Sequence, residues 1–136
     1  MAFEYRFTLG MSSVDAAGVL FYPELFRHAH DAYEALMREA GFGLAEVLRE
    51  GRHALPVVHA EADYRMPMRH GDDIRVSLAV VRLGESSFTI EAEFNNPAGV
   101  LAARVQSVHV WVERSSGQAA PLPEVLRVAL EKRRAD

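Results

Sequence analysis

The chain contains one long segment with helical periodicity. In most of the sequence after that segment, apolar and polar residues alternate instead. After Pro23, apolar residues recur at the i, i+4, i+7 spacing of an amphipathic helix, and Gly41 ends the run. The stripe consists of Leu25, Ala29, Ala32, Tyr33, Leu36, Met37 and Ala40. Pro23 suits the first helical position because proline lacks an N–H that would be unpaired there. The pattern predicts one helix of about 18 residues.

Alternation of apolar and polar residues predicts strands on both sides of this helix. One strand is predicted over residues 3–9, before a loop at 10–18. Four more are predicted at 54–64, 73–83, 87–95 and 100–113. Turn-forming residues join the later strands as hairpins, so the sheet is predicted to be antiparallel. Two short helical patterns lie at 44–49 and 121–134. Because a sheet and a helix bury their apolar faces against each other, the fold class is α+β, with an antiparallel sheet packed on one long helix.

Composition narrows the classes of function. The 136 residues suffice for a single domain, 1–136, with one core. Since there is no cysteine, disulfides, thiolate catalysis and cysteine-ligated metals are excluded. A net charge of −4 argues against a nucleic-acid-binding protein. Neither a signal peptide nor an apolar run long enough for a membrane span is seen, so we expect a cytoplasmic protein with no membrane partner.

The segment before the long helix carries the clearest candidate site. Asp15 and the flexible Gly18 precede Phe21 and Tyr22, which lead into Pro23 and the helix. Hydrolysis of an ester or thioester needs a carboxylate to attack or to activate water, and N–H groups to hold the developing oxyanion. Asp15 could supply the carboxylate, and the backbone N–H groups of Phe21 and Tyr22 could hold the oxyanion beside the helix dipole. The plainer alternative for Asp15 is an aspartate that caps a turn.

Several motifs resemble those of one enzyme family. Residues 15–23, Asp-Ala-Ala-Gly-Val-Leu-Phe-Tyr-Pro, and 30–34, His-Asp-Ala-Tyr-Glu, resemble the signature of hotdog-fold acyl-CoA thioesterases of the 4-hydroxybenzoyl-CoA type. Within that group, residues 54–64, Gly-Asp at 71–72 and Ala-Pro-Leu-Pro at 120–123 resemble the 1,4-dihydroxy-2-naphthoyl-CoA thioesterases. The resemblance covers nearly the whole chain in the right order. It implies a hotdog fold, in which an antiparallel sheet wraps around one long central α-helix.

The resemblance also implies roles for individual residues. Asp15 corresponds to the catalytic carboxylate, Tyr22 to the residue whose N–H binds the thioester oxygen, and Gly18 to a close approach of the backbone to substrate. Many relatives carry an acid where this chain has Ser13, so that first acid is missing here. Asp15 attacks the carbonyl as a nucleophile or acts as a general base toward water, and the sequence leaves both routes open.

Further candidates concern substrate binding. His59 is expected in the substrate pocket from the resemblance, although a lone strand histidine is more often structural. Arg65 and Arg69 are expected to bind the CoA phosphates. Arg104 and the basic residues 132–134 are further candidates for those phosphates, against the plainer alternative of surface charge. The i, i+4 spacing of His30 and Glu34 is typical of a solvated polar stripe, so no metal is expected.

The resulting hypothesis is an enzyme that hydrolyses an aromatic acyl-CoA of the 1,4-dihydroxy-2-naphthoyl or 4-hydroxybenzoyl type without a cofactor, as in menaquinone biosynthesis. Short-chain aliphatic acyl-CoA or acyl carrier protein substrates are an alternative. A non-catalytic acyl-CoA-binding protein is the rival from another class, although such a protein has no need for a carboxylate beside an oxyanion site. Proteins of this fold generally pair, so the resemblance implies a homodimer or homotetramer with the active site where subunits meet.

Overall fold

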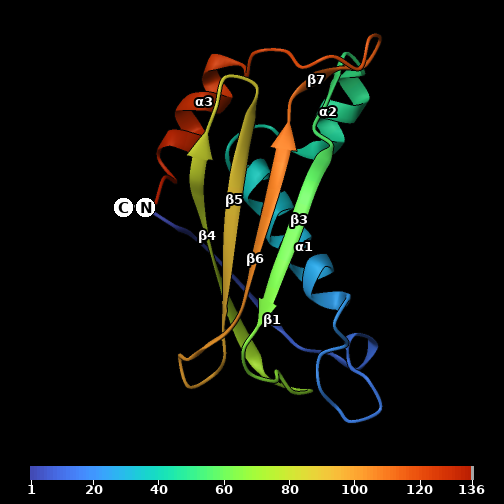
Figure 1. Cartoon of the computed structure of the whole chain (residues 1–136), viewed down its shortest axis with the longest axis vertical. Coiled ribbons are helices and arrows are strands. Elements are labelled where there is room, and N and C mark those ends of the chain that lie inside the picture. Colours follow the sequence, from blue (N-terminus) through green and yellow to red (C-terminus); the bar gives the residue numbers. More distant parts are fainter. Residues whose placement is uncertain (136) are drawn as a thin grey trace.

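The structure is a computed structural model that describes residues 1–135. Its elements are β1 (Phe3–Thr8), the 3-10 helix η1 (Met11–Ser13), α1 (Glu24–Glu39), α2 (Leu44–Glu50), β2 (His53–Ala54), β3 (Val57–Tyr64), β4 (Asp73–Leu83), β5 (Ser87–Asn95), β6 (Leu101–Val110), β7 (Val112–Glu113) and α3 (Glu124–Glu131). Five strands form one antiparallel sheet in the order β1-β4-β5-β6-β3, and β2 and β7 form a small second pair (Figure 1). The predicted α+β class is therefore confirmed.

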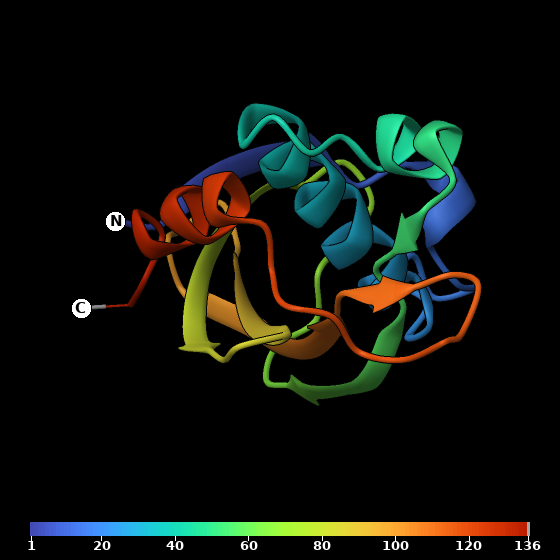
Figure 2. The same ribbon diagram turned by 90° about the horizontal axis from the view of Figure 1, so that it is seen from above.

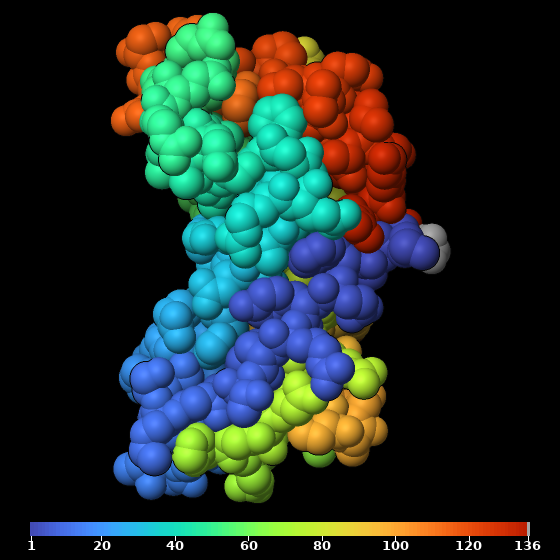
Figure 3. Space-filling model, turned by 180° about the vertical axis from the view of Figure 1, so that it is seen from behind, coloured from blue at the N-terminus to red at the C-terminus, as the bar shows by residue number. Residues whose placement is uncertain are grey.

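The longest of the three α-helices in the described residues is α1, with 16 residues. It follows Pro23, and Gly41 lies just beyond its end with a φ of 84°. Most of the predicted stripe is buried, together with His28, whose burial the pattern did not indicate. Seen from above, α1 lies over the curved sheet, and α3 lies beside β4 (Figure 2). On the face seen from behind, β1, α1, α2 and α3 all lie at the surface (Figure 3).

Two predicted strands are interrupted. The predicted strand 54–64 breaks at Leu55 and Pro56, and the predicted strand 100–113 breaks at Trp111. Proline has no N–H to donate to a strand partner, which favours a break before β3. Trp111 instead donates its N–H to the carbonyl of Ser86 at 2.8 Å and is only 6% exposed. The flanking pieces β2 and β7 then pair with each other, away from the main sheet.

The strand β3 forms one edge of the main sheet. Its register places Ala60, Ala62 and Tyr64 opposite Ser107, Val105 and Ala103 of β6, on the face that packs against α1. The alternate residues of β3, which include His59, lie on the other face. The outward edge of β3 pairs with no strand within residues 1–135. An open edge of eight residues is unusual in a soluble protein, because it offers unpaired backbone groups to another chain.

None of the helices in the described part of the chain is long and apolar enough to cross a membrane.

Candidate active site

The loop that carries Asp15 closes on itself just before α1 begins (Figure 1). The N–H of Asp15 donates to the carbonyl of Val19 at 2.8 Å, and the N–H of Gly18 donates to the carbonyl of Asp15 at 3.0 Å. Gly18 has a φ of 79°, a left-handed conformation that glycine adopts without strain. The tight turn holds Asp15 at the surface of the molecule.

The carboxylate of Asp15 takes part in this turn. Its Oδ1 accepts hydrogen bonds from the N–H groups of Ala17 at 2.8 Å and Val19 at 3.3 Å. Within residues 1–135, no group donates a hydrogen bond to the second oxygen, Oδ2. The turn-capping role and a chemical role are therefore compatible, because one oxygen fixes the carboxylate in the turn while the other accepts no hydrogen bond within the described residues, and the residue is exposed.

The backbone N–H of Tyr22 is free at the start of α1. The N–H of Phe21 donates to the carbonyl of Ser13 at 2.9 Å, and those of Glu24 and Leu25 donate to the carbonyls of Phe21 and Tyr22. No acceptor within the described chain takes a hydrogen bond from the N–H of Tyr22. Of the two donors predicted for an oxyanion site, Phe21 is thus occupied and Tyr22 is available, close to the positive end of the helix dipole.

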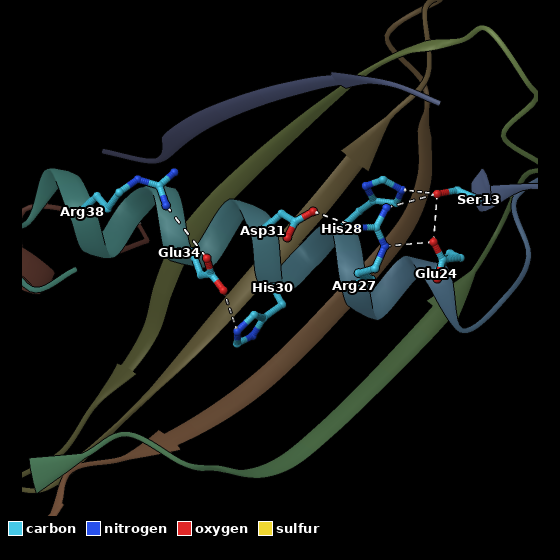
Figure 4. A network of polar contacts seen from close by, with 8 residues as sticks. All are labelled: Ser13, Glu24, Arg27, His28, His30, Asp31, Glu34 and Arg38. Carbon is cyan, nitrogen blue, oxygen red and sulfur yellow. Dashed lines mark hydrogen bonds and ion pairs between the residues drawn. The ribbon is translucent and has the colours of Figure 1, made fainter. Parts of the chain in front are cut away.

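A polar network with two buried members, Ser13 and His28, fixes this loop to α1 (Figure 4). The hydroxyl of Ser13 donates to Oε1 of Glu24 at 2.9 Å and lies 3.0 Å from Nε2 of His28. Arg27 donates to the same Glu24 oxygen at 3.0 Å, and the hydrogen bonds from Arg27 and Ser13 lower the pKa of Glu24. Burial lowers the pKa of His28, whose ring stacks on Phe7 of β1 at 4.0 Å. Because the carbonyl of Ser13 also holds Phe21, one buried serine links the two ends of the loop.

The segment after β3 supports the loop from the other side. Leu20 donates to the carbonyl of Met68 at 2.8 Å, and His70 donates to the carbonyl of Gly18 at 2.9 Å. The hydroxyl of Tyr64 donates to the carbonyl of Tyr22 at 2.6 Å. These contacts bring two predicted phosphate-binding residues to the same region. The backbone of Arg69 forms an isolated antiparallel β-bridge with the backbone of Val19. Arg65 lines a shallow pocket of about 240 Å³, and the other walls of this pocket include Val19, Leu20 and Tyr64. Both arginines are exposed.

Other predicted residues lie elsewhere in the chain. His59 is on the sheet face turned away from α1, with Nε2 3.0 Å from Oε1 of Glu61. Arg104 is on the same outer face and is paired with Glu91 and Glu93. Arg133 binds Glu39 at the far end of α1, about 24 Å along the helix from its start. One chain therefore does not bring His59, Arg104 or Arg133 together with Asp15.

The i, i+4 pair on α1 is a close contact between two exposed polar side chains. Nε2 of His30 lies 3.3 Å from Oε1 of Glu34, and Arg38 lies 3.9 Å from the second oxygen of that carboxylate (Figure 4). In the part of the chain that the structure describes, no three acidic or histidine side chains come close enough to hold a metal ion.

Comparison with known proteins identifies the family. Residues 9–130, which are most of the chain, match the sequence model of the Thioesterase-like superfamily. The chain belongs to this superfamily. Among its relatives is the 1,4-dihydroxy-2-naphthoyl-CoA hydrolase of Rippkaea orientalis, 33% identical over 125 residues, which are 90% of this chain and 91% of the relative. The enzyme of the same name from Nostoc punctiforme is 32% identical over 100% of this chain and 91% of its own length.

Solved structures agree with this membership. The 1,4-dihydroxy-2-naphthoyl-CoA thioesterase from Synechocystis superposes with a TM-score of 0.91 at 28% identity, covering 96% of each chain. A gentisyl-coenzyme A thioesterase superposes with a TM-score of 0.83 at 26% identity, covering 93% of this chain and 98% of its own. The resemblance seen in residues 15–23 and 54–64 is confirmed at the level of the family and of the hotdog fold.

Three residues that hold the loop of the candidate site were not predicted from the sequence. Ser13 was considered only as a departure from the family pattern, Tyr64 only as the end of a predicted strand, and His28 only as a neighbour of the His30 and Glu34 pair on the helix. A signal for Ser13 and His28 existed, because a small polar residue before the helix and a histidine beside an apolar stripe are both unusual in a core. Their pairing depends on the path of the loop back to β1, which no local pattern in the sequence gives.

Proposed function

We propose that this member of the thioesterase-like superfamily hydrolyses an aromatic acyl-CoA, of the 1,4-dihydroxy-2-naphthoyl or 4-hydroxybenzoyl type, to the free acid and CoA. Relatives that match at least 90% of this chain carry the name 1,4-dihydroxy-2-naphthoyl-CoA hydrolase. One observation carries the chemical part of the proposal. Asp15 and Tyr22 lie at the two ends of one hydrogen-bonded loop, and within residues 1–135 Oδ2 of Asp15 accepts no hydrogen bond and the N–H of Tyr22 donates none.

The chemistry depends on these two groups. The carbonyl oxygen of the thioester accepts a hydrogen bond from the N–H of Tyr22. This hydrogen bond stabilises the negative charge that develops on the oxygen when the carbonyl carbon is attacked. One such donor is worth about 3 kcal/mol of the barrier. Asp15 either attacks the carbonyl, giving a mixed anhydride that water then opens, or removes a proton from the water that attacks. In both routes the C–S bond breaks, CoA leaves as a thiolate, and the acyl group ends as the carboxylic acid. Gly18 keeps the turn beside the reacting carbonyl free of a side chain.

Binding of the CoA portion is assigned to the segment after β3. Arg65 and Arg69 are exposed beside the loop, and their guanidinium groups suit phosphate oxygens. A Staphylococcus aureus protein of the same fold, at 15% identity and a TM-score of 0.90, was crystallised with CoA, which supports a CoA-binding role for the fold only. His59 faces away from this region in its own chain, so we infer that any substrate it contacts is bound by a neighbouring chain.

The oligomeric state is part of this proposal. The open edge of β3 carries Val57 and Val58 at 45% and 59% exposure, an arrangement that favours pairing with a second β3 into a continuous sheet. We infer a homodimer, or a homotetramer of two such dimers, in which the joined sheet wraps around the α1 helices. A single domain over 1–136 and a cytoplasmic location complete the proposal.

Steady-state hydrolysis with thiol release as the signal tests the proposal. The panel contains aromatic and short-chain aliphatic CoA thioesters, and the variants are Asp15→Asn and the matched control Asp63→Asn on the outer face of β3. Asparagine keeps the oxygen that accepts from Ala17, so Asp15→Asn is expected to stay folded while turnover falls by at least about a hundredfold. Asp63→Asn is expected to resemble the wild type.

Each outcome has a definite meaning. Preference for an aromatic thioester, lost with Asp15→Asn, supports the proposal. Preference for an aliphatic ester keeps the enzyme but rejects the aromatic substrate. Binding of CoA esters without turnover by the wild type replaces the enzyme with an acyl-CoA-binding protein.

A further inference from the structure

The last residue of β3 reaches the start of α1 through its side chain. The hydroxyl of Tyr64 donates to the backbone carbonyl of Tyr22 at 2.6 Å, which is at the short end of the range for a hydrogen bond between two oxygens. The two residues are 42 positions apart in the sequence. The residue that carries the proposed oxyanion donor is therefore held directly by the main sheet.

Tyr64 is itself fixed to that sheet. Its backbone lies opposite Ala103 in the register of β3 with β6. The N–H groups of the next two residues both donate to the carbonyl of Ala102, at 2.9 Å and 3.1 Å. Beyond this anchor, a tyrosine side chain has few rotatable bonds and a rigid ring. The hydroxyl of Tyr64 therefore keeps a defined position relative to β6.

Tyr22 needs such an anchor because its own N–H has to remain available. Within residues 1–135 this N–H donates to no acceptor, and Tyr22 precedes Glu24, the first residue of α1, so the regular hydrogen bonds of the helix do not fix it. The peptide bond that follows leads into Pro23, which has no N–H. The carbonyl of Tyr22 is the polar group of its backbone that is left for holding it, and the N–H of Leu25 donates to this carbonyl only at 3.3 Å.

The phenol of Tyr64 is a donor throughout the neutral pH range. Burial raises the pKa of Tyr64 above its ordinary value of about 10, so the hydroxyl keeps its proton. A carbonyl oxygen can only accept, which fixes the direction of the hydrogen bond as well. Tyr64→Phe consequently removes this one donor and keeps the ring.

We propose that Tyr64 is a positioning residue, which holds the N–H of Tyr22 in the place where it meets the developing oxyanion. This inference rests on the proposed function and adds to it a residue that acts through another. The charge that an oxyanion donor stabilises is largest in the transition state, so a misplaced donor lowers kcat more than it weakens binding of the ester. Displacements of about 1 Å can cost up to about a hundredfold in rate.

Steady-state kinetics of Tyr64→Phe test the assignment, with Tyr33→Phe as the matched control. Both changes remove one phenolic hydroxyl, but the hydroxyl of Tyr33 has no hydrogen-bond partner within the described residues. In Tyr64→Phe we expect kcat to fall about tenfold, KM to stay within about twofold, and the melting temperature to fall by less than about 4 °C. Tyr33→Phe is expected to keep the kcat and KM of the wild type.

The carbonyl band of a bound ester reports on the oxyanion donor without turnover. A hydrogen bond to the thioester oxygen lowers the stretching frequency of the carbonyl. The difference between infrared spectra of 4-hydroxybenzoyl-CoA with and without a heavy isotope at the carbonyl carbon isolates this band. On the Asp15→Asn protein we expect a frequency below that of the free ester, and adding Tyr64→Phe is expected to return it toward the free value. Adding Tyr33→Phe instead is expected to keep the lowered frequency.

An unchanged kcat and an unchanged carbonyl band in Tyr64→Phe would overturn the positioning role and leave the thioesterase proposal intact. A higher KM or a lower melting temperature at wild-type kcat would also reject it, since the hydrogen bond would then serve binding or stability alone. Absence of turnover for every ester by the wild type would instead contradict the proposed function. The carbonyl band of the bound ester would still decide whether Tyr64 positions the N–H of Tyr22.

Discussion

Removing one buried hydroxyl at Ser13 is expected to weaken both the fold and the proposed active site. Ser13 is 1% exposed, and its hydroxyl meets Glu24 at 2.9 Å and His28 at 3.0 Å. In Ser13→Ala, Glu24 keeps its hydrogen bond from Arg27, so that contact adds little to the loss. His28 is 7% exposed and has no comparable substitute for Nε2, and an unpaired buried group costs about 2 kcal/mol. For a chain of 136 residues this corresponds to a fall in melting temperature of about 6–8 °C.

The same change acts on catalysis through position. The carbonyl of Ser13 holds the N–H of Phe21 at 2.9 Å, so a shift of Ser13 also moves the neighbouring N–H of Tyr22, the proposed oxyanion donor. Displacements of about 1 Å can cost up to about a hundredfold in rate, and we expect kcat to fall at least about tenfold with a smaller change in KM. Urea unfolding and steady-state thiol release measure the two effects, with Ser12→Ala, an exposed neighbour, as the control. A Ser13→Ala protein with wild-type stability and wild-type kcat would refute the reasoning.

Three further predictions each rest on a single observation. Burial lowers the pKa of His109 to about 4 in the folded protein, whereas the unfolded chain protonates this histidine near pH 6.5, so the free energy of unfolding should fall by about 3 kcal/mol between pH 6.5 and pH 4. Urea titrations should show this pH dependence in the wild type and not in His109→Phe. Gly18→Ala meets no atom within 4 Å of its new Cβ, but a φ of 79° should still cost about 1–2 kcal/mol and reduce turnover, measured by thermal melts and thiol release. Val58→Arg on the open edge of β3 should convert the protein from a multiple of 15.1 kDa to a monomer in sedimentation, whereas a monomeric wild type would contradict the pairing of β3.

Periodicity was sufficient to predict most of the fold. The stripe from Leu25 to Ala40 and the alternation in 73–83 and 87–95 have physical causes that act within a few residues, so α1, β4 and β5 lie where they were predicted. The breaks at Pro56 and Trp111 depend on a longer-range event, the pairing of β2 with β7, to which a local pattern is insensitive. The boundary of a strand is set by its partner as much as by its own residues.

The candidate site was predicted less evenly. The motif around Asp15 and Tyr22 was visible because turn, helix start and charge are encoded within a short stretch of sequence. Whether a buried polar group finds a partner, by contrast, is decided by residues distant in the sequence. Ser13 and His28 meet because η1 packs against α1, and Tyr33 and His109 meet because β6 packs against the same helix. The sequence offered His59 as the strand histidine of interest, yet the register of β3 with β6 turns it to the outer face, whereas His109 on β6 is buried against Tyr33 of α1.

The distribution of polar groups along α1 separates two tasks on one helix. One side of its first turns holds the loop through Glu24, Arg27 and His28, whose hydrogen bonds run to Ser13 or to a neighbour on the helix (Figure 4). The other side faces β3 and β6 and carries Tyr33, whose hydroxyl has no partner in the described chain. A network whose members are hydrogen-bonded stabilises a fixed geometry, whereas a buried hydroxyl without a partner raises the free energy of the folded protein. The first turns of α1 therefore hold the loop that carries Asp15 and Tyr22 in one geometry, and the proposed reaction depends on that geometry, because the carboxylate and the oxyanion donor must meet the same carbonyl group.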